Sequence, residues 1–344
     1  MEVSITHTAD GRKRREAVVP SGVKVRPRAW DVAKFEFLHT HNYATSSELV
    51  EYTRYVLPEV ATNYDASIAR LGLLTHETRA AYRSAKTGKD TRFKTPFLDR
   101  PAFQQMSIFK MTNDAIYANT NPAKHVLDDQ DKLSKDAIGR SSSAFHDFLT
   151  SRLTNSIHLG CLREPNRFEF RPHHEVAAEI GRATFPIPMS DPHGMAYNAI
   201  LRPDALLQID YLPSETYINY GVETDGSTEQ GRRTEKSDRG QWRKTIQGNF
   251  ELWHRFINGK LYKQYFGEDS SFVLLYIFNN AGAMKNAMDI CFEVTGGKTH
   301  SFLFKLIPNA EDARRLKVNG INYDIFTEPW NRAGRTPFSI YNVA

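Results

Sequence analysis

The chain has 344 residues, with 45 Lys and Arg against 40 Asp and Glu, a net charge of +5, and 12% aromatic residues. A single core usually stops growing near about 250–300 residues, so this length predicts two domains. The longest apolar run, Phe272–Phe278, is too short to cross a bilayer, and the polar, basic start is unlike a secretion signal. Two cysteines exclude a disulfide framework. We expect a cytoplasmic protein that does not partner a membrane.

Basic residues gather in three stretches of the sequence. Clusters of this kind suit a polyphosphate partner, whereas solvated loop charge is the alternative explanation. The stretches hold Arg12, Lys13, Arg14, Arg15, Lys24, Arg26 and Arg28; then Arg79, Arg83, Lys86, Lys89, Arg92 and Lys94; then Arg232, Arg233, Lys236, Arg239, Arg243 and Lys244.

The N-terminal third predicts three short helices. Apolar spacing indicates a first helix over residues 30–38. Thr45 followed by Glu48 is a capping box, which predicts a second helix over residues 46–56. Pro58 suits the first turn of a third helix, which would end at Gly72.

An extended segment at residues 73–74 and a strand near residues 107–111 would follow these helices, which is the layout of a winged helix-turn-helix. In that layout the third helix enters the DNA major groove, and the basic residues 79–94 would form a wing near the phosphates. A protein–protein module is the alternative. The residues expected to contact DNA are Asn63, Ser67 and Arg70 on the helix and Arg79, Arg83, Arg92 and Lys94 on the wing.

Two strands farther along the chain bring carboxylates together. Residues 205–212 alternate between apolar and polar, a turn follows, and residues 217–225 read as the returning strand. The strand period of two places Glu223 and Asp225 on one face, with Asp204 within reach. Three such carboxylates could hold Mg²⁺ and drive phosphodiester hydrolysis. Solvated acids at strand ends are the alternative.

The rest of the second half predicts an α/β sandwich. Residues 143–158 have helical spacing, and a helix with one apolar face follows from Trp242. Phe272–Phe278 reads as a buried strand and residues 300–307 as another. Residues 168–170 and 175–180 are pieces of undecided type, and the tail after Pro308 is expected to pack on this core.

Pro203-Asp204, a hairpin and Glu223-x-Asp225 resemble the core motif of the PD-(D/E)xK nuclease-like fold. The resemblance implies that Asp204, Glu223 and Asp225 are catalytic and metal-binding. Asp225, however, stands where an active nuclease carries the lysine that positions the attacking water. Two neighbouring acids repel each other unless a cation lies between them.

Some nuclease-fold proteins take the missing lysine from the following helix, where Lys244 is the candidate catalytic residue. At about 100° per residue Lys244 lies opposite the apolar stripe of that helix, whereas a substitute lysine should face the acids. The sequence therefore favours a degenerate nuclease-like domain over an active one.

A wider set of motifs, from Arg28 to about Pro308, resembles the replication–relaxation family of plasmids and other mobile elements. In that family Glu-x-Asp is a usual form, and most members lack a well-defined activity. The matching segments are Trp30-Asp31-x-x-Lys34-Phe35, Tyr43-Ala44-Thr45-Ser46-x-Glu48-Leu49, Arg70-Leu71-Gly72-Leu73-Leu74, the strand-to-helix step Phe109-Lys110-Met111-Thr112-Asn113, Ala144-Phe145-His146-Asp147-Phe148-Leu149, Arg202-Pro203-Asp204-Ala205-Leu206 and Val222-Glu223-x-Asp225-x-x-Thr228-Glu229.

The sequence thus predicts a double-stranded DNA-binding protein of a mobile element that acts in replication or relaxation, or in their control. One alternative is an Mg²⁺-dependent endonuclease or nickase, and only this alternative requires a cofactor. A second alternative is a protein-interaction module. Replication or relaxation proteins and a second copy of the chain are further expected partners. The expected parts are a basic arm (1–27), a winged helix-turn-helix (28–120), a linker (121–142), a PD-(D/E)xK-like sandwich (143–310) and a tail (311–344).

Overall fold

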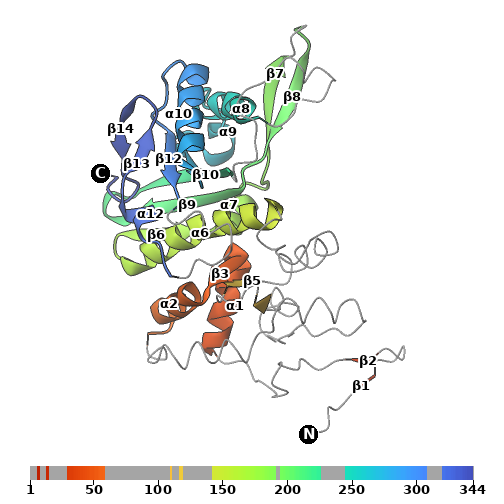
Figure 1. Cartoon of the computed structure of the whole chain (residues 1–344), viewed down its shortest axis with the longest axis vertical. Helices are drawn as coiled ribbons and strands as arrows, with labels where there is room; N and C mark the ends of the chain where they lie inside the picture. The colour runs from red at the N-terminus through yellow and green to blue at the C-terminus, as the bar shows by residue number, and fades with distance from the viewer. Residues whose placement is uncertain are drawn as a thin grey trace. The chain divides into compact units, whose positions relative to one another are not determined.

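The computed structural model describes residues 6–7, 13–14, 29–58, 109–110, 116–118, 142–190, 194–225, 245–307 and 320–343 (Figure 1). The chain divides into two compact units. The first comprises Met1–Asn155 and Asp312–Ile321, and the second comprises Ser156–Glu311 and Asn322–Ala344. Helices and sheets occur in both, so the expected mixed α/β class is confirmed. Among the described helices, none is long and apolar enough to cross a membrane.

The first unit combines helices with a small antiparallel sheet. The strand order in this sheet is β3-β5-β4, and both pairings are antiparallel. A separate pair, β1 and β2, is also antiparallel. The elements are β1 (Thr6–His7), β2 (Lys13–Arg14), α1 (Ala29–His41), β3 (Tyr43–Thr45), α2 (Ser46–Val56), β4 (Phe109–Lys110), β5 (Ile116–Ala118) and the first part of α6 (Ser142–Arg163).

The expected first and second helices of this unit are confirmed as α1 and α2. Thr45 caps α2 as a capping box, because its hydroxyl accepts the Glu48 N–H while the Glu48 carboxylate accepts the Thr45 N–H. The structure adds the strand β3 between these helices. The expected third helix and residues 73–74 lie outside the described residues. Phe109 and Lys110 form the strand β4, near the expected strand, and the rest of the expected strand-to-helix step, Met111-Thr112-Asn113, lies outside the described residues.

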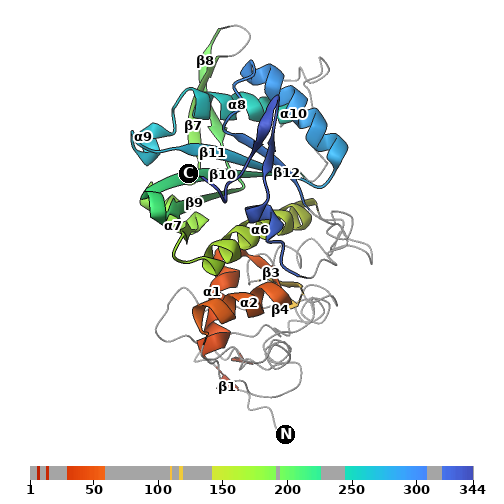
Figure 2. The same ribbon diagram turned by 90° about the vertical axis from the view of Figure 1, so that its left-hand side faces the viewer.

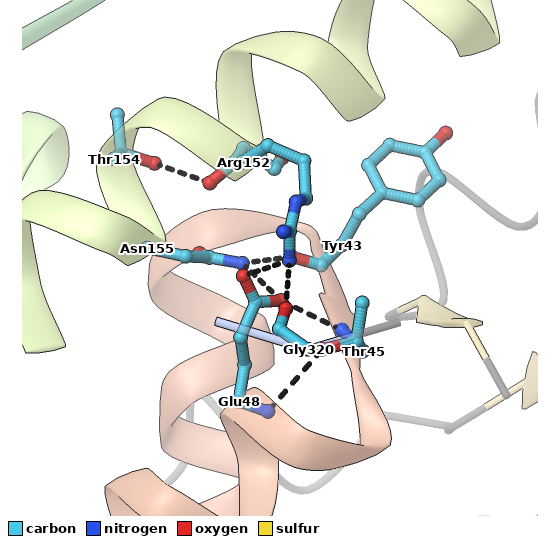
Figure 3. A network of polar contacts seen from close by, with 8 residues as sticks. Tyr43, Thr45, Glu48, Arg152, Thr154, Asn155 and Gly320 are labelled. Carbon is cyan, nitrogen blue, oxygen red and sulfur yellow. Dashed lines mark hydrogen bonds and ion pairs between the residues drawn. The ribbon is translucent and has the colours of Figure 1, made fainter. Parts of the chain in front are cut away.

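A buried polar network joins α2 to the first part of α6 (Figure 3). The Glu48 carboxylate, which is 0% exposed, pairs with the Arg152 guanidinium and accepts a hydrogen bond from the Asn155 amide at 3.1 Å. The same amide donates to the Tyr43 carbonyl at 2.9 Å, and Arg152 donates to the Gly320 carbonyl at 2.8 Å. Burial raises the pKa of Glu48, and the Arg152 charge and the hydrogen bonds with Thr45 and Asn155 oppose that rise.

The second unit is built on a seven-stranded sheet of order β14-β13-β12-β11-β10-β9-β6. Strands β10, β11 and β12 are parallel to one another, and the remaining neighbours are antiparallel. Its elements are the rest of α6, β6 (Phe168–Arg171), α7 (His173–Glu179), β7 (Phe185–Ser190), β8 (Ala196–Leu201), β9 (Ala205–Tyr211), a 3-10 turn (Leu212–Ser214), β10 (Thr216–Asp225), α8 (Ile246–Asn258), α9 (Lys263–Phe266), β11 (Phe272–Phe278), α10 (Ala281–Thr295), β12 (Phe302–Leu306), α12 (Asp324–Thr327), β13 (Trp330–Arg332) and β14 (Arg335–Phe338).

Helices cover both faces of this sheet (Figures 1 and 2). On one face α8 and α10 bury an aromatic core in which Phe250 contacts Tyr276 and Phe304. On the other face His158 of α6 stacks on Phe170 of β6, with ring centroids 4.5 Å apart. Because β11 lies between two helical layers, its run of apolar residues is buried almost throughout.

The elements predicted for this unit are largely confirmed. Strands β9 and β10 match the two predicted around the turn, and β11 has the predicted bounds. The helix α6 continues five residues beyond the predicted end, because buried Leu159 and Cys161 extend its apolar face. Residues 175–180 proved largely helical, as α7. The hairpin β7–β8 was not predicted, and β13 and β14 of the tail extend the sheet.

Candidate functional site

The expected acidic residues lie at one end of the central strands of the second unit. Strands β9 and β10 are antiparallel with Ala205 opposite Val222, so Asp204 lies beside the C-terminal part of β10. The Asp204 N–H donates to the Val222 carbonyl at 2.9 Å, and its carboxylate accepts the Thr224 N–H at 2.9 Å. The Asp204 carboxylate thereby continues the hydrogen-bond ladder past the start of β9, which fixes its position against β10.

Glu223 and Asp225 share one face of β10, as their spacing predicted, and both are buried, at 2% and 1% exposure. On the neighbouring strand β11 their partners in the register are Tyr276 and Phe278. The Glu223 carboxylate accepts a hydrogen bond from the Trp253 indole N–H of α8 at 3.0 Å. A buried carboxylate needs such donors, so Trp253 fixes the orientation of Glu223.

Gly221 makes the approach of this tryptophan to the sheet feasible. A Cβ atom at Gly221 would lie 2.4 Å from the Trp253 ring atom Cη2 and 3.2 Å from the Phe272 ring. Only glycine therefore allows the indole to lie over β10 two residues before Glu223. Helical spacing places Trp253 on the apolar face of α8, and that spacing alone does not indicate this polar role.

Asn249 is a further candidate site residue, which no sequence motif indicated. It lies four residues before Trp253 on α8 and is 7% exposed, and its side-chain Nδ2 has no hydrogen-bond partner among the described residues. Because α8 connects the parallel strands β10 and β11, it runs opposite to them. Asn249 is therefore about 6 Å nearer than Trp253 to the Asp225 end of β10, measured along the helix axis. In the sequence, Asn249 is four residues from Trp253, which places both side chains on one face of the helix, and this spacing could have identified Asn249.

His173 binds the backbone next to this site. Its ring Nδ1 accepts the backbone N–H of Leu206 at 2.9 Å, just after Asp204. Burial lowers the pKa of His173, and the neighbouring His174 lowers it further. Because an accepting nitrogen carries no proton, this role requires the neutral ring.

The other expected site residues lie outside the described residues. They are Lys244, Asn63, Ser67, Arg70, Arg79, Arg83, Arg92 and Lys94. Within the described residues, no group of three or more His, Cys, Asp or Glu side chains is arranged to hold a metal ion. Mg²⁺ binding by Asp204, Glu223 and Asp225 therefore stays a prediction.

Comparisons with known proteins gave no match: no protein-family model, no curated protein and no solved structure matches the chain.

Proposed function

We propose that the chain is a double-stranded DNA-binding protein of a mobile element that acts in replication or relaxation, or in their control. Its first unit is a winged helix that reads DNA. Its second unit is a PD-(D/E)xK-like sandwich that serves as a platform for DNA or a partner and has lost efficient nuclease chemistry. The order of the elements in the second unit, together with the position of its acids, carries this proposal.

The strand order supports the nuclease-like fold. After α6 the central sheet takes up the antiparallel strands β6, β9 and β10, with α7 and the hairpin β7–β8 inserted between β6 and β9. Then come α8, the short α9 and β11, which is parallel to β10. A helix, three antiparallel strands, a second helix and a parallel strand are the elements expected of a PD-(D/E)xK core. Asp204 directly precedes β9 and lies beside the C-terminal part of β10, which carries Glu223, and this placement supports the motif.

The small sheet of the first unit supports the winged helix. A winged helix pairs a strand located between its first and second helices with the last strand of the domain, which then lies in the middle of the sheet. Here β3 separates α1 from α2, and β5 lies between β3 and β4. The charge of the chain, with basic clusters near residues 79–94 and 232–244, supports DNA as the partner.

The environment of the acids favours a platform over an efficient nuclease. Asp225 occupies the position of the nuclease lysine, and α8 contains no lysine within its bounds. The Asp204 carboxylate accepts a backbone N–H, and the Glu223 carboxylate accepts the Trp253 indole. Each of these hydrogen bonds occupies a lone pair of a carboxylate oxygen that could otherwise coordinate a metal ion.

An Mg²⁺-dependent endonuclease is the second candidate, because Asp204, Glu223 and Asp225 do meet at one sheet end. Both candidates are tested by incubating the full chain with supercoiled and linear duplex DNA in Mg²⁺, Mn²⁺ or EDTA. Binding is read on the same samples by gel shift. Asp204→Ala and Glu223→Gln run alongside, with Glu169→Ala, an exposed acid on β6, as the matched control.

We expect binding without cutting, and equal affinity for all four proteins. Metal-dependent nicking that disappears in Asp204→Ala and Glu223→Gln but survives in Glu169→Ala would establish the endonuclease instead. If the chain does not bind DNA, the protein-interaction module is the remaining candidate function.

The winged helix is tested by charge reversal in the expected wing. Arg92→Glu with Lys94→Glu should weaken binding at least about tenfold at low salt, because phosphate contacts dominate affinity. Lys285→Glu with Lys298→Glu, which reverses two exposed lysines of the second unit, is the control and should bind as the unmodified chain does. Equal retention of both variants on DNA would contradict DNA binding by the wing.

A further inference from the structure

The hairpin β7–β8 of the second unit stands out from the sandwich (Figures 1 and 2). One of its faces is anchored, because Phe185, Ile187 and Leu201 are buried in the core beside α8. The other face is open: Ala196, Asn198 and Ile200 are exposed, with Ile200 at 56%. Neither strand contains a charged residue, in a chain that is 25% charged.

The outer edge of β7 is closed to further strands. Pro186 and Pro188 lie opposite Ile200 and Asn198, and proline has no N–H. The bonds exchanged within the hairpin therefore belong to the alternate pairs, such as Ile187 with Ala199, and the polar backbone atoms of Pro186 and Pro188 point outward. The Pro188 carbonyl accepts a hydrogen bond from Arg255 at 3.1 Å, which agrees with this direction. Prolines on an edge are a common protection against unwanted pairing.

The outer edge of β8 lacks this protection. Opposite the outward-facing residues of β7 lie Ala196, Asn198 and Ile200, so their N–H and C=O groups also point away from the hairpin. Within the described part of the chain, β7 is the one strand that pairs with β8. All three residues are exposed, and β8 has neither a proline nor a charge. Such an edge is a template for another strand.

We propose that two copies of this chain pair through the outer edges of their β8 strands, antiparallel about a twofold axis at Asn198. In this register Asn198 faces Asn198 of the second copy, and Ala196 faces its Ile200. Each outward N–H and C=O of the three residues then finds a partner, since every hydrogen-bonded pair exchanges two bonds. The Asn198 side chains meet on the exposed face, where two amides can bond to each other.

Two properties of β8 favour a second copy over a strand of different sequence. Twofold pairing places β8 beside its own equivalent, so a strand with a charged edge would repel its copy, whereas β8 is uncharged. The paired sheet would also have β7 at both ends, and both ends would be closed by Pro186 and Pro188. Assembly therefore stops at a dimer and does not continue into a fibre.

The first test measures the mass of the full chain by sedimentation or light scattering over a concentration series. High salt keeps bound nucleic acid from bridging copies. We expect a dimer that Asn198→Pro weakens at least about tenfold, because the variant removes the central donor and copies the protection found on β7. Ser190→Pro, at the last outward position of β7, is the matched control and should leave dimerisation unchanged.

The second test reads the register. The native Cys161 and Cys291 are buried, so an introduced cysteine is the accessible thiol among the described residues. Paired residues at the axis have Cα atoms about 5.5 Å apart, within disulfide range. Asn198→Cys should therefore form a disulfide-linked dimer on mild oxidation, and faster than Ala199→Cys, whose equivalents are offset along the strand.

The proposal is overturned if the chain stays monomeric up to about 100 µM, in which case this edge would suit a strand of another protein. It is also overturned if Asn198→Pro does not weaken the dimer, or if Ala199→Cys cross-links as fast as Asn198→Cys. Far-UV circular dichroism of each variant shows that the loss of the dimer is not the loss of the fold.

Discussion

Each unit buries a glutamate, and the two glutamates differ in what surrounds them. Glu48 of the first unit pairs with a buried arginine and also accepts the Thr45 N–H and the Asn155 amide. Glu223 of the second unit accepts an uncharged indole N–H and lies on the same strand face as a second acid, Asp225. The contacts of Glu48 join α2 to the first part of α6 and so stabilise the first unit. The second arrangement collects acids at the C-terminal ends of parallel strands, where α/β sheets place their ligands.

The largest effect should come from Glu48→Gln. Glutamine retains the N3 position of the capping box, but it removes the carboxylate charge that pairs with the buried Arg152 guanidinium. We expect the free energy of unfolding to fall by about 3–5 kcal/mol, measured by chemical denaturation. The double variant with Arg152→Met should be less destabilised than the sum of the single variants. A loss below about 1 kcal/mol would mean that the pair does not stabilise this unit.

A smaller effect is expected for Gly221→Ala in the second unit. The added Cβ would lie 2.4 Å from the Trp253 ring, so the indole must move away from β10 and from Glu223. We expect a loss of about 1–3 kcal/mol in stability together with a shift in tryptophan fluorescence. Combining it with Trp253→Phe, which removes the clashing ring atoms, should restore part of the loss. Unchanged fluorescence would show that the indole does not rest on Gly221.

Trp253→Phe alone tests what the indole does for Glu223. The variant removes one hydrogen-bond donor from a buried carboxylate, which should cost about 1–3 kcal/mol in the free energy of unfolding. In the double variant Glu223→Gln with Trp253→Phe the losses should not add, because both changes break the same bond. Additive losses would indicate that the indole and the carboxylate act separately.

The smallest effect at neutral pH is expected for His158→Gln, about 1 kcal/mol through the lost stacking on Phe170. Burial lowers the pKa of His158 to about 3, below the ordinary 6.5, so the folded state excludes the proton that the unfolded chain accepts. The unmodified protein should lose stability as the pH falls below about 6.5 toward 3. The variant should lose less over that range, and identical pH profiles would contradict this assignment.

Much of the second unit follows from local patterns in the sequence. The alternation in β9, the apolar run of β11 and the stripe of α8 each specify an element without reference to the rest of the chain. The capping box of α2 is equally local, since Thr45 and Glu48 are three residues apart. By contrast, the hairpin β7–β8 was not predicted, because two prolines in β7 argue against a strand unless that strand is at an edge.

The strand period of two places Glu223 and Asp225 on one face of β10 wherever that strand lies, so the sequence is sufficient to predict this pair of acids. What the two acids contact depends on how the elements pack in the folded chain. Trp253 is 30 residues away along the chain and reaches Glu223 because Gly221 leaves room for its ring. Likewise Arg152 is 104 residues from Glu48. Such partners are set by packing between elements, which no local spacing encodes.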